Sequence, residues 1–274
     1  MTAKILELII RCFIKLPNSV LDFIFTICYP LYAITHTNRA WKRTLIHLRK
    51  CGFPKSRITV RGVFHSLFLN EIDSLRYLVN DPQNKPDVSY ENESVLTNCI
   101  KAGMPVVLVG IHQGAFEMQH RALLRYSPTV HLFTQSLHCK ALNQAIRNIR
   151  KRAGLKEHDT NEVGSVLKQV IREKGVMALA VDQSHGSKGN EVELFGRKSH
   201  LFLRLPIKAN QMGAAIVTFR TFWVRGFEHV VRFENVYAPK TNPEELTASI
   251  ANEVEVWIGE HPHQWTWNYH RNFT

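Results

Sequence analysis

The chain has 274 residues, with 35 Lys and Arg against 23 Asp and Glu, so its formal net charge is +12. This length can bury one large α/β core, and the strongly basic balance indicates a polyanionic partner: nucleic acid, an anionic membrane or an acidic carrier protein. Its five cysteines are scattered, without a Cys-x-x-Cys pair. That usage argues against a disulfide framework or a zinc site and indicates a reducing compartment.

No linker or low-complexity segment divides the chain, so we expect an N-terminal membrane-anchoring helical segment (residues 1–38) followed by one catalytic domain (residues 39–274). Residues 4–34 are mostly apolar, but charges interrupt them. The longest charge-free run, Phe23 to Asn38, is shorter than the roughly 20 residues that span a bilayer, and it contains Pro30.

Apolar residues recur in the first 16 positions at helical intervals, which predicts a helix lying in the membrane interface or a short hairpin dipping into it. A helical hairpin packed on its own domain is the alternative. The absence of a clear small-residue cleavage site argues against a secretory signal. A basic stretch follows at once, as expected near anionic headgroups on the cytoplasmic side. It comprises Arg39, Lys42, Arg43, Arg49, Lys50, Lys55 and Arg57.

The apolar spacing predicts one or two helices over residues 58–80 and a short helix over Glu93–Ala102, with a polar surface loop between them. Val106 to Val109 is a short β-branched run that predicts a buried strand, and Gly110 ends it. Val130 to Thr134 and Val176 to Val181 predict two further strands.

Leu142 to Ala153 predicts a basic helix, and the next helix begins near a Thr160 or Asn161 cap and closes at Gly175. Five further elements are expected toward the C-terminal part of the sequence. They are a turn at Leu194–Gly196, a helix over Leu201–Met212 weakened by Pro206, a strand over Ala214–Phe219, an exposed strand over residues 229–237, and a helix from the Asn242 cap to about Gly259.

The candidate site lies where the Val106–Val109 strand ends, because open α/β sheets place reactive groups just outside the carboxyl ends of their strands. His112, Gly114 and Glu117 follow that strand within one turn region. If His112 lies in the loop and Glu117 in the first helical turn, Gly114 allows the two side chains to meet. Glu117 then fixes the imidazole tautomer while His112 acts as general base. A loop histidine beside a capping acid is the alternative.

Polar residues also follow the predicted Val176–Val181 strand, where Asp182 and Gln183 begin a loop. We expect Asp182 to pin that loop rather than act as a nucleophile. Arg150 precedes the helix-ending Gly154, and its guanidinium could hold an anionic or carbonyl group, although a solvated basic face is an equal alternative. The tail from Pro262 to Phe273 is aromatic and basic; its alternate aromatics favour one buried face over nucleic-acid stacking.

These motifs, taken together and in order, resemble the late acyltransferases of lipid A biosynthesis. They are Gly110-Ile111-His112-Gln113-Gly114-Ala115-Phe116-Glu117, Asp182-Gln183, Phe195-Gly196, Gly213-Ala214 and Gln264-Trp265-Thr266-Trp267-Asn268-Tyr269-His270-Arg271. The His-x4-acid motif alone is weak, whereas its combination with Asp-Gln and the Gln-Trp-x-Trp tail is fairly specific. The resemblance covers most of the chain.

The resemblance implies a mostly parallel central α/β sheet flanked by helices, as in glycerol-phosphate acyltransferases. It implies transfer of a fatty acyl chain from acyl carrier protein or a CoA thioester to a hydroxyl of a lipid A-type glycolipid, at the cytoplasmic face of a bacterial inner membrane. His112 and Glu117 match the catalytic pair, Arg150 the arginine of an Arg-x3-Gly motif, and Asp182 the Asp-Gln aspartate. Gly114, Arg150, Asp182 and Gln183 are then the substrate-binding residues.

The expected mechanism needs no metal, cofactor or covalent enzyme intermediate. Backbone N–H groups near Gly114, with Arg150, are expected to face the oxyanion. Three departures bear on acceptor identity and acyl length: Ala115-Phe116 stands where many members carry Asn-Trp, Ala215 where proline often follows Gly-Ala, and His263 where glutamate often precedes the Gln-Trp pair.

The sequence is also compatible with two other classes of protein. One is an acyltransferase of the same fold acting on a lysophospholipid, an amine or a polyene headgroup. The other is a non-enzymatic basic protein that binds membrane or nucleic acid; for the acyltransferase we expect no nucleic-acid partner. A metal hydrolase is disfavoured, because no histidines show His-Glu-x-x-His spacing.

Overall fold

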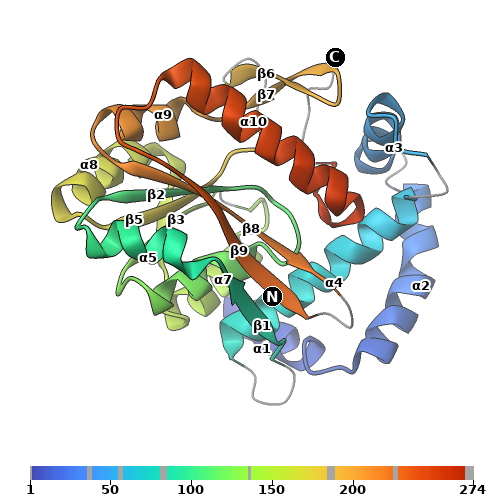
Figure 1. Cartoon of the computed structure of the whole chain (residues 1–274). Helices are drawn as coiled ribbons and strands as arrows, with labels where there is room; N and C mark the ends of the chain where they lie inside the picture. Colours follow the sequence, from blue (N-terminus) through green and yellow to red (C-terminus); the bar gives the residue numbers. More distant parts are fainter. Residues whose placement is uncertain are drawn as a thin grey trace.

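A seven-stranded sheet forms the middle layer of the computed structural model, which describes residues 2–35, 39–54, 58–80, 85–134, 137–183, 189–224 and 228–268 (Figure 1). Its strand order is β1-β9-β8-β2-β5-β3-β4. The strands are β1 (Val88–Glu91), β2 (Val106–Gly110), β3 (Val130–Thr134), β4 (Lys156–Asp159), β5 (Val176–Ala180), β8 (Ala215–Trp223) and β9 (His229–Tyr237). A separate antiparallel hairpin pairs β6 (Asn190–Leu194) with β7 (Arg197–Leu201).

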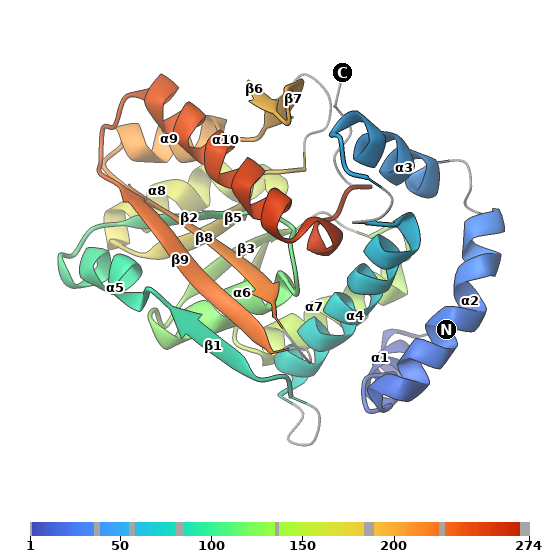
Figure 2. The same ribbon diagram turned by 45° about the vertical axis from the view of Figure 1, so that its right-hand side comes forward.

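Helices flank this sheet on both faces (Figure 2). Their bounds are α1 (Ala3–Phe13), α2 (Asn18–Thr35), α3 (Ala40–Lys50), α4 (Val60–Val79), α5 (Glu93–Lys101), α6 (Glu117–Ala122), α7 (Lys140–Arg152), α8 (Val163–Glu173), α9 (Arg204–Gln211) and α10 (Pro243–Glu260), with short 3-10 turns η1 (Leu123–Arg125), η2 (Thr160–Glu162) and η3 (Pro262–Gln264).

Strand pairing in the sheet is mostly parallel, as predicted. Every neighbouring pair is parallel except β8 with β9. Because β1 runs with β9 and therefore against β2, the first residue of β1 lies at the same sheet edge as the carboxyl end of β2. That edge also receives the carboxyl end of β5, which pairs with β2 from Val106–Val176 to Gly110–Ala180.

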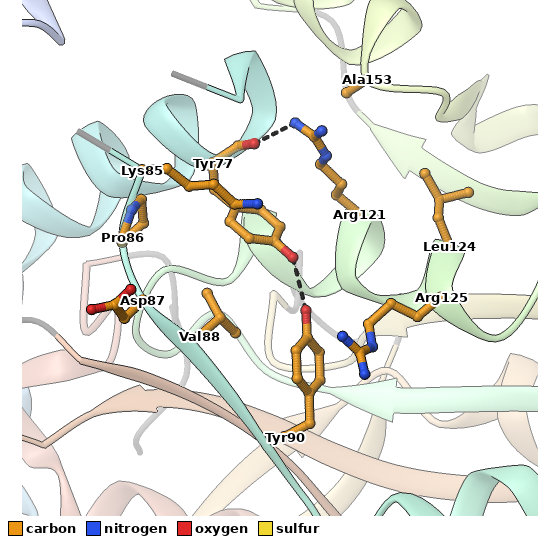
Figure 3. A pocket seen from close by; sticks show the side chains of 10 residues that line it. All are labelled: Tyr77, Lys85, Pro86, Asp87, Val88, Tyr90, Arg121, Leu124, Arg125 and Ala153. Atoms are coloured by element: carbon orange, nitrogen blue, oxygen red, sulfur yellow. Dashed lines mark hydrogen bonds between the residues drawn. The ribbon is translucent and has the colours of Figure 1, made fainter. Parts of the chain in front are cut away.

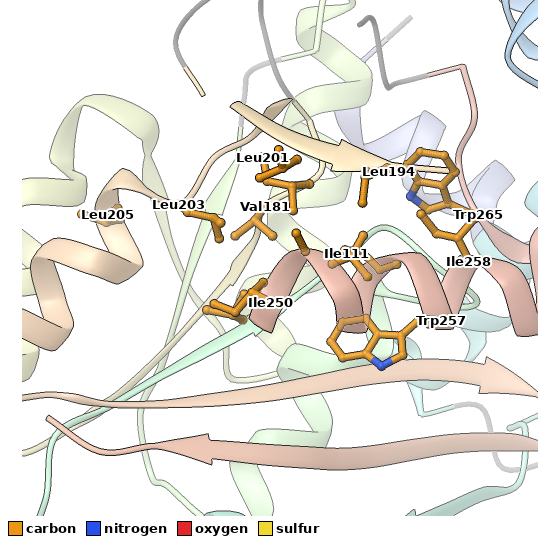
Figure 4. Packing of buried hydrophobic residues seen from close by; sticks show 14 of the residues in the cluster. Ile111, Val181, Leu194, Leu201, Leu203, Leu205, Ile250, Trp257, Ile258 and Trp265 are labelled. Carbon is orange, nitrogen blue, oxygen red and sulfur yellow. The ribbon is translucent and has the colours of Figure 1, made fainter. Parts of the chain in front are cut away.

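Side chains of β2 alternate between two hydrophobic cores, which is why the strand is buried along its whole length. Val107 and Val109 join the core beneath α8, α9 and α10, where Figure 4 shows Ile250 and Trp257 packed with Ile111. Val106 and Leu108 join the core on the other face, which α5, α6 and α7 cover.

Several elements differ from expectation where local pattern is a poor guide. The polar loop before α5 contains the edge strand β1, and the short β4 was not expected at all. The helix expected over Leu201–Met212 is a strand end followed by α9, in which Pro206 falls in the first turn, where a missing N–H breaks no helical hydrogen bond. The first half of β9 is buried rather than exposed. The helix expected to begin near a Thr160 or Asn161 cap is α8, and the capping box before it is formed by Asp159 and Glu162.

The N-terminal helices pack on the domain by one side. Ile14 and Leu21 are buried against Leu69 and Ile72 of α4. Arg76 closes this contact: its Nε donates to the Ile14 carbonyl at 2.8 Å and its Nη2 to the Leu16 carbonyl at 2.6 Å. Its Nη1 donates to the Asn18 side chain at 2.7 Å and to Asp73 at 3.0 Å. In the described ranges, no helix combines the length and apolar character needed to cross a bilayer.

The buried Arg76 gives a stability prediction. Arg76→Met should lower the free energy of unfolding by about 3–5 kcal/mol, because it leaves two carbonyl groups without their donor and removes the cationic partner of buried Asp73, which then keeps only its contact with His229. Arg172→Met is the matched control, since that arginine is 76% exposed and pairs only with an adjacent glutamate in the described structure. Urea titration followed by tryptophan fluorescence measures both; equal changes in the two variants would contradict the prediction.

Candidate active site

The loop between β2 and α6 lies directly against the backbone of β8, and a glycine makes this close approach possible. Gly114 has φ +58°, and a Cβ on it would lie 2.5 Å from the carbonyl oxygen of Thr221. Its N–H donates to the Gln264 carbonyl at 2.9 Å. Only glycine tolerates both the left-handed conformation and the close backbone approach. The loop is therefore held between a strand and the C-terminal segment.

Asp182 fixes the imidazole of His112. It lies two residues after β5, next to the end of β2, and its side chain is 1% exposed. Its Oδ1 lies 2.7 Å from Nδ1 of His112, and its two oxygens accept the His112 backbone N–H at 3.1 and 3.0 Å. One carboxylate therefore sets both the position of the residue and the orientation of its ring.

The C-terminal segment completes this arrangement. Nε1 of Trp265 donates to Oδ2 of Asp182 at 2.8 Å, and the N–H of Thr266 donates to the His112 carbonyl at 3.1 Å. Trp265 and Trp267 are fully buried, as the alternate-aromatic pattern predicted. Tyr269, His270 and Arg271 lie outside the described residues, as do Lys55 and Arg57 of the basic stretch.

Glu117 does not have the role expected of it. It is the first residue of α6, and both its oxygens accept hydrogen bonds from Arg150 of α7, one from Nε at 3.0 Å and one from Nη2. The expectation that Glu117 orients the imidazole is therefore wrong, because Asp182 does so. The spacing argument failed because the partner of His112 comes from the neighbouring strand, 70 residues away.

Two expected oxyanion donors are also committed elsewhere. The N–H of Gly114 is occupied by the Gln264 carbonyl. Arg150 directs its Nη1 toward Glu157 at 3.4 Å while its other two nitrogens bind Glu117. The guanidinium thus joins α6, α7 and β4 rather than pointing at a substrate oxygen. Gln183 lies half-buried just beyond Asp182.

The imidazole remains accessible although its environment is tightly built. The His112 side chain is 15% exposed. Phe116 packs edge-on against it, with ring centroids 4.7 Å apart and an interplanar angle of 69°. Phe116 thereby limits rotation of the ring, and it stands where the resembled family often carries tryptophan.

Charges at the site favour an ionised aspartate beside a basic histidine. Burial lowers the pKa of His112, but the Asp182 carboxylate, with Glu117 and Glu71 further off, outweighs burial and raises that pKa above its usual value. Burial raises the pKa of Asp182, and the His112 contacts and the Trp265 hydrogen bond more than offset it, so the pKa is lowered. An ionised carboxylate only accepts hydrogen bonds, so Nδ1 of His112 carries the hydrogen.

The same balance keeps the second carboxylate charged. Burial opposes ionisation of Glu117, but the charge and hydrogen bonds of Arg150 outweigh it and lower the pKa of Glu117. On the same helix His120 is buried, which lowers its pKa to about 4 and keeps the ring neutral. The site therefore contains two ionised carboxylates with different partners.

Sequence reasoning missed Glu71. This residue lies on α4 and keeps some surface in contact with solvent. The surrounding protein atoms desolvate its carboxyl group, and this desolvation, followed by the charge of Glu117, raises the pKa of Glu71 to about 7. It also interacts electrostatically with Arg150 and His112. The segment Phe68 to Leu75 also contains Asn70, Asp73 and Ser74, so the sequence held no signal that singled out Glu71.

Comparisons with known proteins give a family. The family model described as bacterial lipid A biosynthesis acyltransferase matches residues 73–274. A search of the curated proteins found no match. Among solved structures, the crystal structure of the 1-acyl-sn-glycerophosphate (LPA) acyltransferase PlsC from Thermotoga maritima aligns with a TM-score of 0.40 and 12% identity, over 89% of this chain and 96% of that chain. The family match spans the end of α4, the whole sheet and the tail. The chain belongs to the bacterial lipid A biosynthesis acyltransferases.

Proposed function

We propose that the protein transfers a fatty acyl chain from an acyl thioester to a hydroxyl of a lipid A-type glycolipid, with His112 as general base. One observation carries this proposal: the 2.7 Å contact between His112 Nδ1 and a buried carboxylate, in a histidine whose side chain is still 15% exposed. A base oriented in this way is what activation of an alcohol requires.

The reaction follows from the tautomer. With its hydrogen on Nδ1, the ring uses Nε2 as an acceptor for the proton of the substrate hydroxyl. The hydroxyl oxygen attacks the thioester carbonyl as His112 takes that proton, and Asp182 stabilises the imidazolium formed. Collapse of the tetrahedral intermediate forms the ester and breaks the carbon–sulfur bond, and the departing thiolate recovers the proton from His112. No covalent enzyme intermediate is needed.

Glu117 and Arg150 serve this site by position and charge. Their ion pair joins the start of α6 to α7, which fixes the helix that follows the catalytic loop. The Glu117 carboxylate also contributes to the raised pKa of His112. Glu117 is thus a positioning residue in this proposal, and no cofactor or metal takes part.

The partners follow from charge and exposed apolar surface. A net charge of +12 suits an acidic acyl carrier protein or a CoA thioester, and also an anionic bilayer. On α2, Phe23, Ile27, Leu31 and Ile34 are each more than half exposed and recur at helical spacing. Such a stripe on a helix suits insertion into the interface of a membrane. We place the protein at the cytoplasmic face of a bacterial inner membrane.

Removing either proposed group should abolish most transfer. His112→Ala removes the base and should lower kcat roughly 10²–10⁴-fold. Glu117→Ala leaves Arg150 without its partner, and we expect a comparable loss. Radiolabelled acyl transfer from acyl carrier protein measures both, with circular dichroism to confirm folding. His138→Ala, at an exposed histidine, is the control; wild-type activity in the His112 variant would refute the assignment.

The raised pKa of His112 gives a pH prediction. The base must be neutral, so kcat/KM should rise with pH through a pKa above the usual histidine value. Asp182→Asn removes the charge that raises this pKa and leaves burial to lower it. The acidic limb of the profile should therefore move to lower pH while the maximal rate falls.

Glu71 supplies the control for that profile. Its carboxyl titrates near 7 and faces the same groups, so it could itself produce an acidic limb. Glu71→Gln removes this titration while leaving Asp182 in place. An acidic limb that vanishes in Glu71→Gln and is unmoved in Asp182→Asn would assign it to Glu71 and contradict the prediction.

Membrane association has its own test. The double variant Phe23→Asp, Leu31→Asp places two charges in the exposed stripe of α2 and should greatly reduce flotation with vesicles of phosphatidylglycerol and phosphatidylcholine. Val224→Asp, Val256→Asp makes the same change at exposed valines elsewhere and should leave flotation unchanged. Equal flotation of both variants would count against an interfacial role for α2.

A further inference from the structure

A cavity of about 630 Å³ lies beside the residues that lead into β1 (Figure 3). It lies between the end of α4, the residues leading into β1, the α6–η1 segment and the end of α7. Its lining residues are Tyr77, Lys85, Pro86, Asp87, Val88, Tyr90, Arg121, Leu124, Arg125 and Ala153. The residues proposed to carry out transfer are not among them.

The lining is cationic. The lining contains three cationic residues, Lys85, Arg121 and Arg125, and one acidic residue, Asp87. Arg121 is fixed by donating from Nη1 to the carbonyl of Tyr77 and, at 2.6 Å, to that of Leu78 (Figure 3). Neutral carbonyl groups hold this guanidinium in place without cancelling its charge.

The other two cations are steadied by aromatic faces. Nζ of Lys85 lies 5.2 Å from the centre of the Tyr77 ring, and the Arg125 guanidinium lies 4.2 Å from that of Tyr90. A cation–π contact by itself orients a charge without neutralising it, but Arg125 also has a carboxylate partner. The carboxylate of Glu93 lies 3.7 Å from Arg125, and it also accepts a hydrogen bond from Tyr126.

The two tyrosine hydroxyls add a neutral donor. Their oxygens lie 2.8 Å apart, in the middle of the cavity wall (Figure 3). Only one hydrogen can lie between two hydroxyl oxygens, so the second hydrogen is available to another acceptor. Burial, and next the hydrogen bond with Tyr77, raise the pKa of Tyr90, which keeps this hydroxyl protonated.

The cavity is one helical turn from the catalytic machinery. Arg121 follows Glu117 by four residues on α6, and Ala153 follows Arg150 by three at the end of α7. Four residues of helix rise about 6 Å, so both elements of the Glu117–Arg150 pair continue directly into the cavity wall. Tyr77 also packs on Ala115 and Met118, which flank the catalytic loop.

We propose that this cavity binds a phosphate group of a substrate. The inference deepens the proposed acyl transfer and rests on it. Even with Glu93 counted beside Asp87, the three cations leave an excess of one positive charge. With planar guanidinium groups and a tyrosine donor, this matches an anionic phosphate group with several acceptor oxygens. Val88 and Leu124 provide apolar surface for the group to which the phosphate is attached. The phosphate belongs either to a phosphorylated glycolipid acceptor or to the pantetheine arm of the acyl donor.

Binding is tested first with inorganic phosphate, independently of transfer. The full-length double variant Lys85→Gln, Arg125→Gln removes two cations whose side chains are exposed and spares Arg121, which caps α4. Its affinity for phosphate at low ionic strength, from ³¹P NMR titration, should fall at least tenfold. The control Lys168→Gln, Arg172→Gln removes the same charge from exposed positions on α8 and should change affinity less than twofold. Equal losses in both variants would overturn the site in favour of diffuse attraction.

Steady-state kinetics then identify the source of the phosphate. If it belongs to the acceptor, the cavity variant should raise KM at least fivefold for a phosphorylated glycolipid, keep kcat within twofold, and leave KM for the dephosphorylated glycolipid unchanged. If it belongs to the donor, KM should rise for acyl carrier protein or CoA thioesters instead. Phosphate affinity lost without either change in KM would overturn a substrate site. If the wild type transfers no acyl chain at all, the proposed function fails, while the phosphate titration still reports on the cavity.

Discussion

One buried carboxylate holds the site together. Asp182 accepts hydrogen bonds from the backbone and ring of His112 and from the indole of Trp265, so three segments far apart in the sequence converge on a single side chain. An ionised carboxylate buried without partners would cost several kcal/mol, which makes each of these donors part of the stability of the fold as well as of the chemistry. Loop, strand end and tail are therefore fixed together.

The two acidic residues of the site, Asp182 and Glu117, have different partners and different roles. Asp182 orients the ring of His112, the proposed base, and Glu117 binds the Arg150 that ties α6 to α7. Each carboxylate is ionised because its own cationic or donor partner offsets burial. The arrangement explains how an acid five residues after His112 can matter to the reaction without bonding to its ring: it sets the helix on which the catalytic loop ends.

Much of the fold was predictable because it depends on local pattern. The Val106–Val109 run predicted β2, and Asn242 predicted the start of α10, whose cap it forms. What failed depends on contacts between distant segments. The partner of His112 lies just after the neighbouring strand β5, so spacing within the motif pointed to the wrong acid. The edge strand β1 exists because β9 pairs with it, and Glu71 approaches the site because α4 packs against α6. Neither the β1–β9 pairing nor the α4–α6 packing can be recognised from the local sequence of the segments involved.

The geometry around the imidazole also dictates a direction. Phe116 covers one part of the ring edge-on, and the Nδ1 side is closed by Asp182. The lone pair of Nε2 lies in the ring plane and points away from that carboxylate. In the proposed reaction, the acceptor hydroxyl must therefore approach Nε2 along this one line, within the plane of the ring, and the position of the attacking oxygen is set by the Asp182 contact before the acceptor arrives.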